Sequence, residues 1–184
     1  MRVISGSARS LKLKTLDSMD TRPTQDRTKE TLFNVLNPFM ADCRFLDLFA
    51  GSGGIGIEAL SRGADFCAFI EQNPKAIECI NYNLSFTKLD KRAKVYRGDV
   101  MTVLRQLDHG QAFHCIFMDP PYNKELEKQV LTYLSKSTLM DDDTLIVVEA
   151  SLETDFSYLC ELGSKDYKRK QYKTNQHVFI QREI

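Results

Sequence analysis

Short apolar segments alternate with amphipathic segments along most of the chain. Apolar runs rich in branched and aromatic residues predict seven strands, at 44–49, 66–71, 93–98, 113–118, 143–149, 166–173 and 176–182. Segments of helical length separate the first five strands, and the clearest helix is predicted at 74–87. Since crossovers between parallel strands are right-handed and cover the sheet, this order predicts an α/β fold with a doubly wound, mostly parallel, Rossmann-like sheet.

The two ends of the chain depart from this alternation. Residues 2–14 alternate around a Gly-Ser pair and predict a β-hairpin, and a helix over 26–37 would link it to the first strand. We therefore expect a hairpin extension at 1–16 and a main domain at 17–184. The last two strands, joined through Thr174 and Asn175, should be antiparallel because no helix separates them.

Length and composition limit the classes of protein to consider. The chain has 184 residues, of which 42% are hydrophobic and 27% charged, so one ordinary globular domain is expected. No apolar run is long enough to span a membrane and the start is not a signal peptide, so we expect a cytoplasmic protein without membrane contact. We also expect a monomer. The five cysteines and three histidines are too scattered to predict a metal site.

The net charge is zero, but its distribution is uneven. Residues 1–31 carry seven basic and four acidic residues, residues 165–184 carry six and two, and the segment between them is acidic. If the two ends meet, they would form a positive face that could contact nucleic-acid phosphates. Solvated charge on edge strands is the other interpretation. The predicted hairpin would expose four basic side chains, those of Arg2, Arg9, Lys12 and Lys14.

A glycine-rich loop follows the first strand. Gly51, Gly53 and Gly56 form a G-x-G-x-x-G pattern between a predicted strand and a predicted helix, and Glu71 ends the next strand. Glycines let the backbone approach a ligand, and a carboxylate placed like Glu71 accepts hydrogen bonds from ribose hydroxyls. The pattern predicts a nucleotide-containing cofactor, and up to this point a nicotinamide dehydrogenase fits equally well.

Two further acidic residues favour S-adenosylmethionine as that cofactor. Asp47 lies just before the glycines, where a carboxylate would repel a pyrophosphate but attract a cationic aminoacyl group. Asp99 follows the third strand and could accept from an adenine amine, with Val100 as an apolar wall for the ring.

The tetrapeptide DPPY follows the fourth strand, and parallel sheets bind ligands at this edge. The prolines fix the backbone, so that the Asp119 carboxylate and the Pro120 carbonyl are held as acceptors before a substrate arrives. Two fixed acceptors could orient the lone pair of an aromatic amine toward an electrophilic methyl group, and Tyr122 could stack on the base. A loop breaker after a strand is the alternative role of this segment.

With these residues in place, the chain resembles the bacterial RsmD-type family, which methylates a guanine amine in small-subunit (16S) ribosomal RNA. The resemblance covers nearly the whole chain and includes ISGSAR at 4–9, RPTQDRTKETLFNVL at 22–36, the glycine loop, FIEQNP, GDV and DPPY. It implies a class I methyltransferase in which cofactor is bound by Asp47, Gly51, Ser52, Gly53, Glu71, Asp99 and Val100. It also implies that Asp119, Pro120 and Tyr122 are catalytic and hold the guanine, and that the basic hairpin contacts ribosomal RNA, free or in a ribosomal particle.

Several alternatives stay open at this stage. Arg22 could contact a phosphate or the cofactor carboxylate, or it could be exposed beside a helix capped by Thr24 or Asp26. Glu149, at the end of the fifth strand, is interpreted as structural or supporting. The competing functions are a DNA adenine amino-methyltransferase and a non-catalytic RNA-binding assembly factor.

Overall fold

Seven strands form one sheet in a computed structural model that describes residues 1–16, 23–122 and 124–183. Along the sheet the order is β3-β2-β1-β4-β5-β7-β6. The strands are β1 (Arg44–Asp47), β2 (Phe66–Glu71), β3 (Ala93–Arg97), β4 (Cys115–Met118), β5 (Leu145–Ser151), β6 (Ser164–Gln171) and β7 (Asn175–Arg182). Strands β1 to β5 pair in parallel, and β7 pairs antiparallel with β5 and β6. The predicted doubly wound, mostly parallel, seven-stranded sheet is confirmed.

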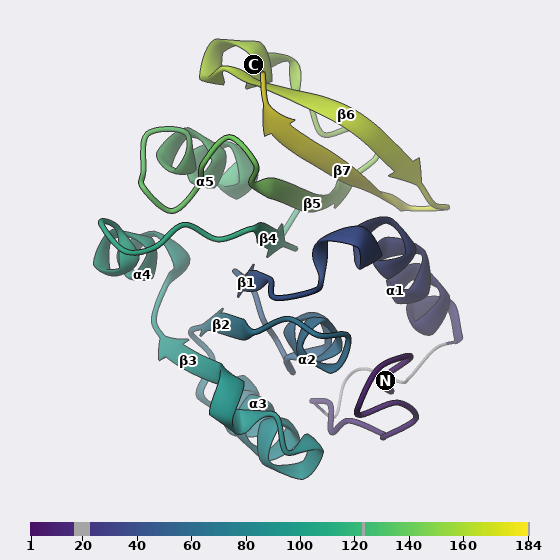
Figure 1. Ribbon diagram of the computed structural model, residues 1–184. Coiled ribbons are helices and arrows are strands. Elements are labelled where there is room, and N and C mark those ends of the chain that lie inside the picture. Colours follow the sequence, from purple (N-terminus) through teal and green to yellow (C-terminus); the bar gives the residue numbers. More distant parts are fainter. Residues whose placement is uncertain (17–22, 123, 184) are drawn as a thin grey trace.

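Helices cover both faces of this sheet. They are α1 (Pro23–Leu36), α2 (Gly54–Ser61), α3 (Pro74–Thr87), α4 (Val100–Leu107) and α5 (Leu126–Leu134), with short 3-10 helices at η1 (Asn37–Phe39), η2 (Asp90–Arg92) and η3 (Ser157–Leu162). Figure 1 shows α1 and α2 on one side of the sheet and α4 and α5 on the other. Within the described part of the chain, every helix falls short of the length and apolar character that a membrane crossing requires.

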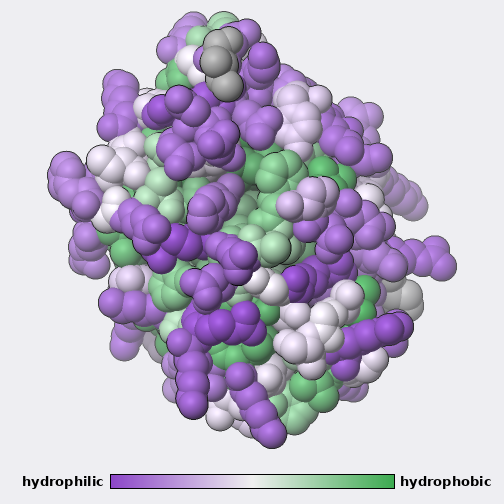
Figure 2. Space-filling model, in the orientation of Figure 1, coloured by the Kyte–Doolittle hydropathy of each residue, from purple (hydrophilic) through white to green (hydrophobic). Residues whose placement is uncertain are grey.

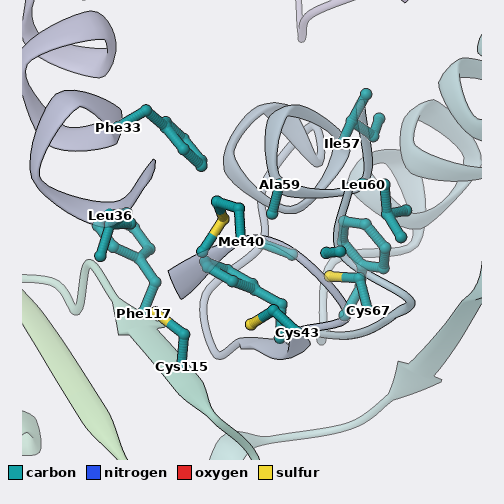
Figure 3. Packing of buried hydrophobic residues seen from close by; sticks show 14 of the residues in the cluster. Phe33, Leu36, Met40, Cys43, Ile57, Ala59, Leu60, Cys67, Cys115 and Phe117 are labelled. Atoms are coloured by element: carbon teal, nitrogen blue, oxygen red, sulfur yellow. The ribbon is translucent and has the colours of Figure 1, made fainter. Parts of the chain in front are cut away.

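The buried residues form two clusters, one on each face of the sheet. Phe117 of β4 belongs to the cluster under α1 and α2, whereas its neighbours Ile116 and Met118 belong to the cluster under α4 and α5. Figure 3 shows Phe33 and Leu36 of α1 reaching from their helix toward the middle of the first cluster. Hydrophilic side chains cover most of the molecular face in Figure 2, with smaller apolar areas between them. Successive side chains of a central strand such as β4 point to opposite faces of the sheet, so each strand supplies apolar side chains to both helical layers.

Some predicted boundaries were wrong by a few residues. β1 ends at Asp47 rather than at 49, because Leu48 and Phe49 already form the turn into the glycine loop. β5 begins at Leu145 and continues to Ser151, since its second half pairs with β7 as far as Asn175. The helix predicted over 26–37 begins at Pro23 and ends at Leu36.

The predicted N-terminal β-hairpin is confirmed only at its ends, where the Val3 amide donates to the Leu11 carbonyl and the Leu13 amide to the Met1 carbonyl, each at 3.0 Å. Residues 2–14 contain one isolated antiparallel bridge, between Arg2 and Lys12, with turns between them. The reason is that the backbone between them bonds to α2 instead of to an opposite strand. The Ser7 amide donates to the Ser61 carbonyl at 2.8 Å and the Ala8 amide to the Ser61 hydroxyl at 2.9 Å. We call residues 1–16 the N-terminal extension.

Candidate active site at the carboxyl edge of the sheet

The glycine loop joins the end of β1 to the start of α2. Gly53 precedes the helix in a left-handed conformation, and the Gly56 amide donates to Asp47 Oδ2 at 3.0 Å. A Cβ on Gly56 would lie 2.3 Å from the Phe69 ring of β2, so only glycine permits this approach of the helix to the sheet. Asp47 and Gly56 together fix the position of the loop.

Asp47 is a buried acid beneath this loop. The residue is 1% exposed, and its second carboxylate oxygen has no hydrogen-bond partner among the described residues. Burial raises the pKa of Asp47 to about 7, although the Gly56 amide opposes the shift. A buried carboxylate without a counter-ion is typical of a site that binds a positively charged ligand.

Glu71, at the end of β2, is held by backbone amides. Its Oε2 accepts from the Gly51 amide at 2.8 Å, and its Oε1 accepts from the Gln72 and Asn73 amides, each at 2.8 Å. This carboxylate therefore ties the glycine loop to the second strand. Oε2 keeps a further lone pair for a ligand hydroxyl, whereas both lone pairs of Oε1 are used by the backbone amides.

A pocket of about 190 Å³ lies beside Glu71. Its walls are mostly apolar and are formed by Leu48, Phe49, Ile70, Val100, Met101, Leu126 and Val130, with Glu71, Gln72, Gly98 and Asp99 at its polar side. Asp99 also caps α4, since its Oδ1 accepts from the Thr102 amide at 3.0 Å, and hydrogen bonding to Thr102 lowers its pKa. Apolar walls with a few carboxylates are suited to a nucleoside.

The DPPY segment lies next to the glycine loop. β4 pairs with β1 so that Phe117 is opposite Asp47, and Asp119 follows two residues later on the same edge. Asp119 has a solvent-exposed surface, but neighbouring protein atoms partly desolvate its carboxylate. This desolvation and, to a smaller extent, the charges of Glu149 and Asp47 raise the pKa of Asp119 to about 7. Pro120 is buried and Tyr122 is 45% exposed. The charge of Asp119 contributes to the raised pKa of Tyr122, so the two side chains are close enough to interact.

Comparison with known proteins identifies the family of this chain. A family model described as "Conserved hypothetical protein 95" matches residues 1–181. The "Ribosomal RNA small subunit methyltransferase D" of Escherichia coli (strain K12) is 38% identical over 153 residues, which cover 83% of this chain and 76% of that protein. The chain belongs to the RsmD-type methyltransferase family.

Other members and solved structures extend this similarity. YlbH of Bacillus subtilis (strain 168) is 43% identical over 84% of this chain and 85% of its own length. The solved structure of yhhF from Escherichia coli has a TM-score of 0.86 and 33% identity, covering 100% of this chain and 98% of that one. The similarity to the RsmD-type family therefore includes the N-terminal extension and the last two strands.

The basic residues predicted to contact RNA lie on the N-terminal extension. Arg2, Arg9, Lys12 and Lys14 are all exposed, but Arg2 Nε is paired with Asp26 at 3.1 Å. Arg2, Arg9 and Lys12 line a groove of about 840 Å³ between the extension and α1. Arg22 lies outside the described residues. Figure 1 shows α1 between the extension and the β6–β7 hairpin, so the backbones of the two basic ends do not lie side by side.

Two buried polar residues that connect the extension to the site were not predicted. Glu58 of α2 is fully buried and accepts from the Ile4 and Ser5 amides, and it pairs with Lys29 at 3.1 Å and Arg62 at 2.8 Å. Glu58 was detectable as the one acid within the apolar segment of α2, but its partners are far away in sequence.

Asn83 of α3 is the second of these residues. Its side chain accepts from the Lys14 amide at 2.8 Å and donates to the Lys14 and Ser52 carbonyls, both at 2.9 Å. It therefore joins the end of the extension to the glycine loop. No sequence signal distinguished Asn83 from other polar helix residues.

Glu149 of β5 occupies a more central place than the sequence indicated. It lies beside Asp119 at the sheet edge, and its charge contributes to the raised pKa values of Asp119 and Tyr122. Its Oε2 contacts His177 Nε2 of β7 at 3.1 Å, and its Oε1 accepts from the Asn175 side chain. The acid at the end of LIVVEA and an antiparallel strand at 176–182 were predicted, but the pairing of that strand with β5, which places His177 beside Glu149, was not.

Proposed function

We propose that this chain transfers a methyl group from S-adenosylmethionine to the exocyclic N2 amine of a guanine in small-subunit ribosomal RNA. The observation that carries the proposal is the juxtaposition of the DPPY segment with the glycine loop on neighbouring strands β4 and β1. The names of its relatives support the ribosomal RNA substrate, since the Escherichia coli protein is named a small subunit methyltransferase.

The residues of the pocket fit S-adenosylmethionine, which supplies an electrophilic methyl group on a positively charged sulfur. Glu71 and Asp99 would accept hydrogen bonds from the nucleoside, and Val100 with the other apolar walls would contact the adenine ring. The unpartnered oxygen of Asp47 provides a negative potential beside the glycine loop. Gly51, Ser52 and Gly53 would contact the cofactor through their backbone.

The DPPY segment would position the nucleophile. The Asp119 carboxylate and the Pro120 carbonyl accept hydrogen bonds from the two N–H groups of the amine, which directs its lone pair toward the methyl group. Asp119, with a pKa of about 7, is suited to take up the proton that the amine loses. Tyr122 remains protonated because burial and the charges of Glu149 and Asp119 raise its pKa to about 12, and its exposed ring can stack on the base.

Radiolabelled methyl transfer into small ribosomal subunits tests this proposal. The subunits come from a strain that lacks the corresponding methyltransferase, and plasmid DNA is offered in parallel. We expect label in the RNA alone, at N2 of one guanine, and a loss of at least about 100-fold for Asp119→Ala. Asp143→Ala, which changes an exposed aspartate before β5, should retain the wild-type rate.

Three outcomes would contradict the proposal. Label only in plasmid DNA would indicate an adenine amino-methyltransferase. Full rescue of a deletion strain by Asp119→Ala would indicate that RNA binding, rather than catalysis, is the function. If calorimetry showed that the protein binds a nicotinamide dinucleotide and not S-adenosylmethionine, the proposed cofactor would be wrong.

A further inference from the structure

A second carboxylate lies next to Asp119 at the edge of the sheet. β4 and β5 are parallel and pair Met118 with Val148, so Asp119, which directly follows β4, is next to Glu149 of β5. Both are two positions beyond residues of the same buried cluster, Phe117 and Val147, and alternate strand residues share a face. Neighbouring strands are about 4.8 Å apart, which places the two acids side by side.

The Glu149 carboxylate is held from the β7 side. His177, directly opposite on β7, is 1% exposed and contacts Oε2, while Asn175 donates to Oε1. The other ring nitrogen of His177 lies 3.1 Å from the Tyr172 hydroxyl, and its ring packs edge-on against Phe117. In the tautomer whose Nε2 donates to Glu149, the Nδ1 of His177 can accept from the Tyr172 hydroxyl.

The Glu149 side chain nevertheless remains open to the site. One fifth of its surface is exposed, and each of its oxygens has a second lone pair. Two adjacent carboxylates repel each other, and this repulsion helps to raise the pKa of Asp119. Such an arrangement is unfavourable for folding alone and is typical of a site that binds hydrogen-bond donors.

The Watson–Crick edge of guanine presents donors with matching spacing. Guanine has an N1–H beside its N2 amine, whereas adenine has a bare N1 acceptor beside its amine. We propose that Glu149 accepts a hydrogen bond from guanine N1–H while Asp119 binds the neighbouring amine, so that Glu149 selects guanine over bases with an unprotonated N1. This inference rests on the proposed function and assigns the base specificity of the same site to Glu149. His177 and Asn175 act as positioning residues.

The test compares guanine with 2,6-diaminopurine at the target position of reconstituted small subunits. Diaminopurine keeps the amine at C2 but has a lone pair at N1. We expect the wild-type enzyme to methylate guanine at least about tenfold faster, by kcat/KM, than diaminopurine. Glu149→Gln should reduce this ratio by about tenfold or more, because its amide can donate to diaminopurine N1.

Two further variants accompany this comparison. Glu153→Gln removes an exposed charge near the same edge and should keep the wild-type ratio. Asn175→Ala removes the hydrogen bond to one Glu149 oxygen. It should lower the ratio of guanine to diaminopurine methylation less than Glu149→Gln does. If thermal denaturation shows that Glu149→Gln is unfolded, Asn175→Ala is used in its place.

The outcomes separate the two proposals. If Glu149→Gln slows both substrates equally, Glu149 has only a structural role and the inference is overturned. If the wild-type enzyme methylates neither base at N2, the proposed function itself fails. A fall in the guanine preference with intact folding supports both.

Discussion

Asp47 shows how one buried charge connects stability with binding. Its carboxylate holds the Gly56 amide, yet it is removed from water and has one unpartnered oxygen. The folded-state pKa of about 7 is above the ordinary value of 3.8, so the folded protein binds the proton more tightly than the unfolded chain. The contribution of Asp47 to the free energy of unfolding therefore falls as pH rises from about 4 to about 7.

Asp47→Asn should remove this pH-dependent loss. We expect the variant and the wild-type protein to have the same melting temperature near pH 4.5. Above pH 7 the variant should melt at a higher temperature, with a free energy of unfolding that is larger by about 1–3 kcal/mol. Its affinity for S-adenosylmethionine should fall, because the negative potential at the loop is lost. Thermal denaturation across pH and calorimetry measure the two effects. A stability difference that does not change with pH would show that Asp47 is ionised throughout.

Asp119 determines the expected pH dependence of methyl transfer. Its carboxylate must be ionised to accept both a hydrogen bond and a proton, and its pKa is raised to about 7. Single-turnover rates should therefore rise with pH and level off near or below pH 7, since a bound cation favours the ionised form. Asp143→Ala should keep this profile. A rate that is flat from pH 5.5 to 8 would exclude Asp119 as the titrating group.

At the scale of elements, the N-terminal extension is joined to the site through α2 and α3. Glu58 and Ser61 bind its backbone from α2, and Asn83 links its end to Ser52 of the glycine loop. The residues predicted to contact RNA and those predicted to contact cofactor therefore share the same supports. The extension that was predicted as a hairpin is held by buried side chains of the main domain.

Gly6→Ala should displace this extension. Gly6 has a positive φ of 85°, and a Cβ there would lie 1.8 Å from the Ser61 carbonyl oxygen. We expect RNA affinity to fall about tenfold while cofactor affinity is retained, because the glycine loop is also held by Asp47 and Glu71. Filter binding and calorimetry measure the two affinities.

Gly163→Ala is the matched control for this change. Gly163 also has a positive φ, of 63°, but a Cβ there would have no heavy atom within 4 Å. Both variants carry backbone strain, and only Gly6→Ala carries the clash. Equal effects of the two on RNA affinity would show that docking of the extension does not matter for binding.

At the scale of the whole molecule, the acidic sheet edge is distinct from the groove beside α1, although Asp26 and Glu30 also line that groove. Asp47, Asp119 and Glu149 make the sheet edge negative, whereas Arg9, Lys12 and other basic residues lie on the groove beside α1. An RNA that binds here would place its phosphates along the groove and insert only a base into the acidic site. The basic residues of the N-terminal extension can therefore attract phosphates locally, although the net charge of the chain is zero.

The salt dependence of RNA binding tests this separation. Replacing Arg9 and Lys12 by Gln should weaken binding and reduce the slope of log affinity against log salt by about 1.4–1.8. Replacing Lys91 and Lys94, which lie at the opposite end of β3 from the site, should leave the slope unchanged. An equal loss in both double variants would indicate that RNA contacts are spread over the whole surface.

The sequence by itself determined the sheet, the glycine loop and the place of DPPY. These depend on local patterns, because an apolar strand, a glycine turn and a helix are each encoded within about ten residues, and chain order then fixes which strand ends meet. The positions of Asp47, Glu71 and Asp119 at one edge followed from this rule and are found in the structure.

Only the tertiary structure decided how the site is supported. Glu58 meets Ile4 across 54 residues of sequence, Asn83 meets Lys14 across 69, and Glu149 meets His177 across 28. Such contacts leave no periodic signal, since each joins single polar residues whose burial depends on packing of distant elements. The same contacts limit the predicted hairpin to one antiparallel bridge, because the backbone between its ends bonds to α2.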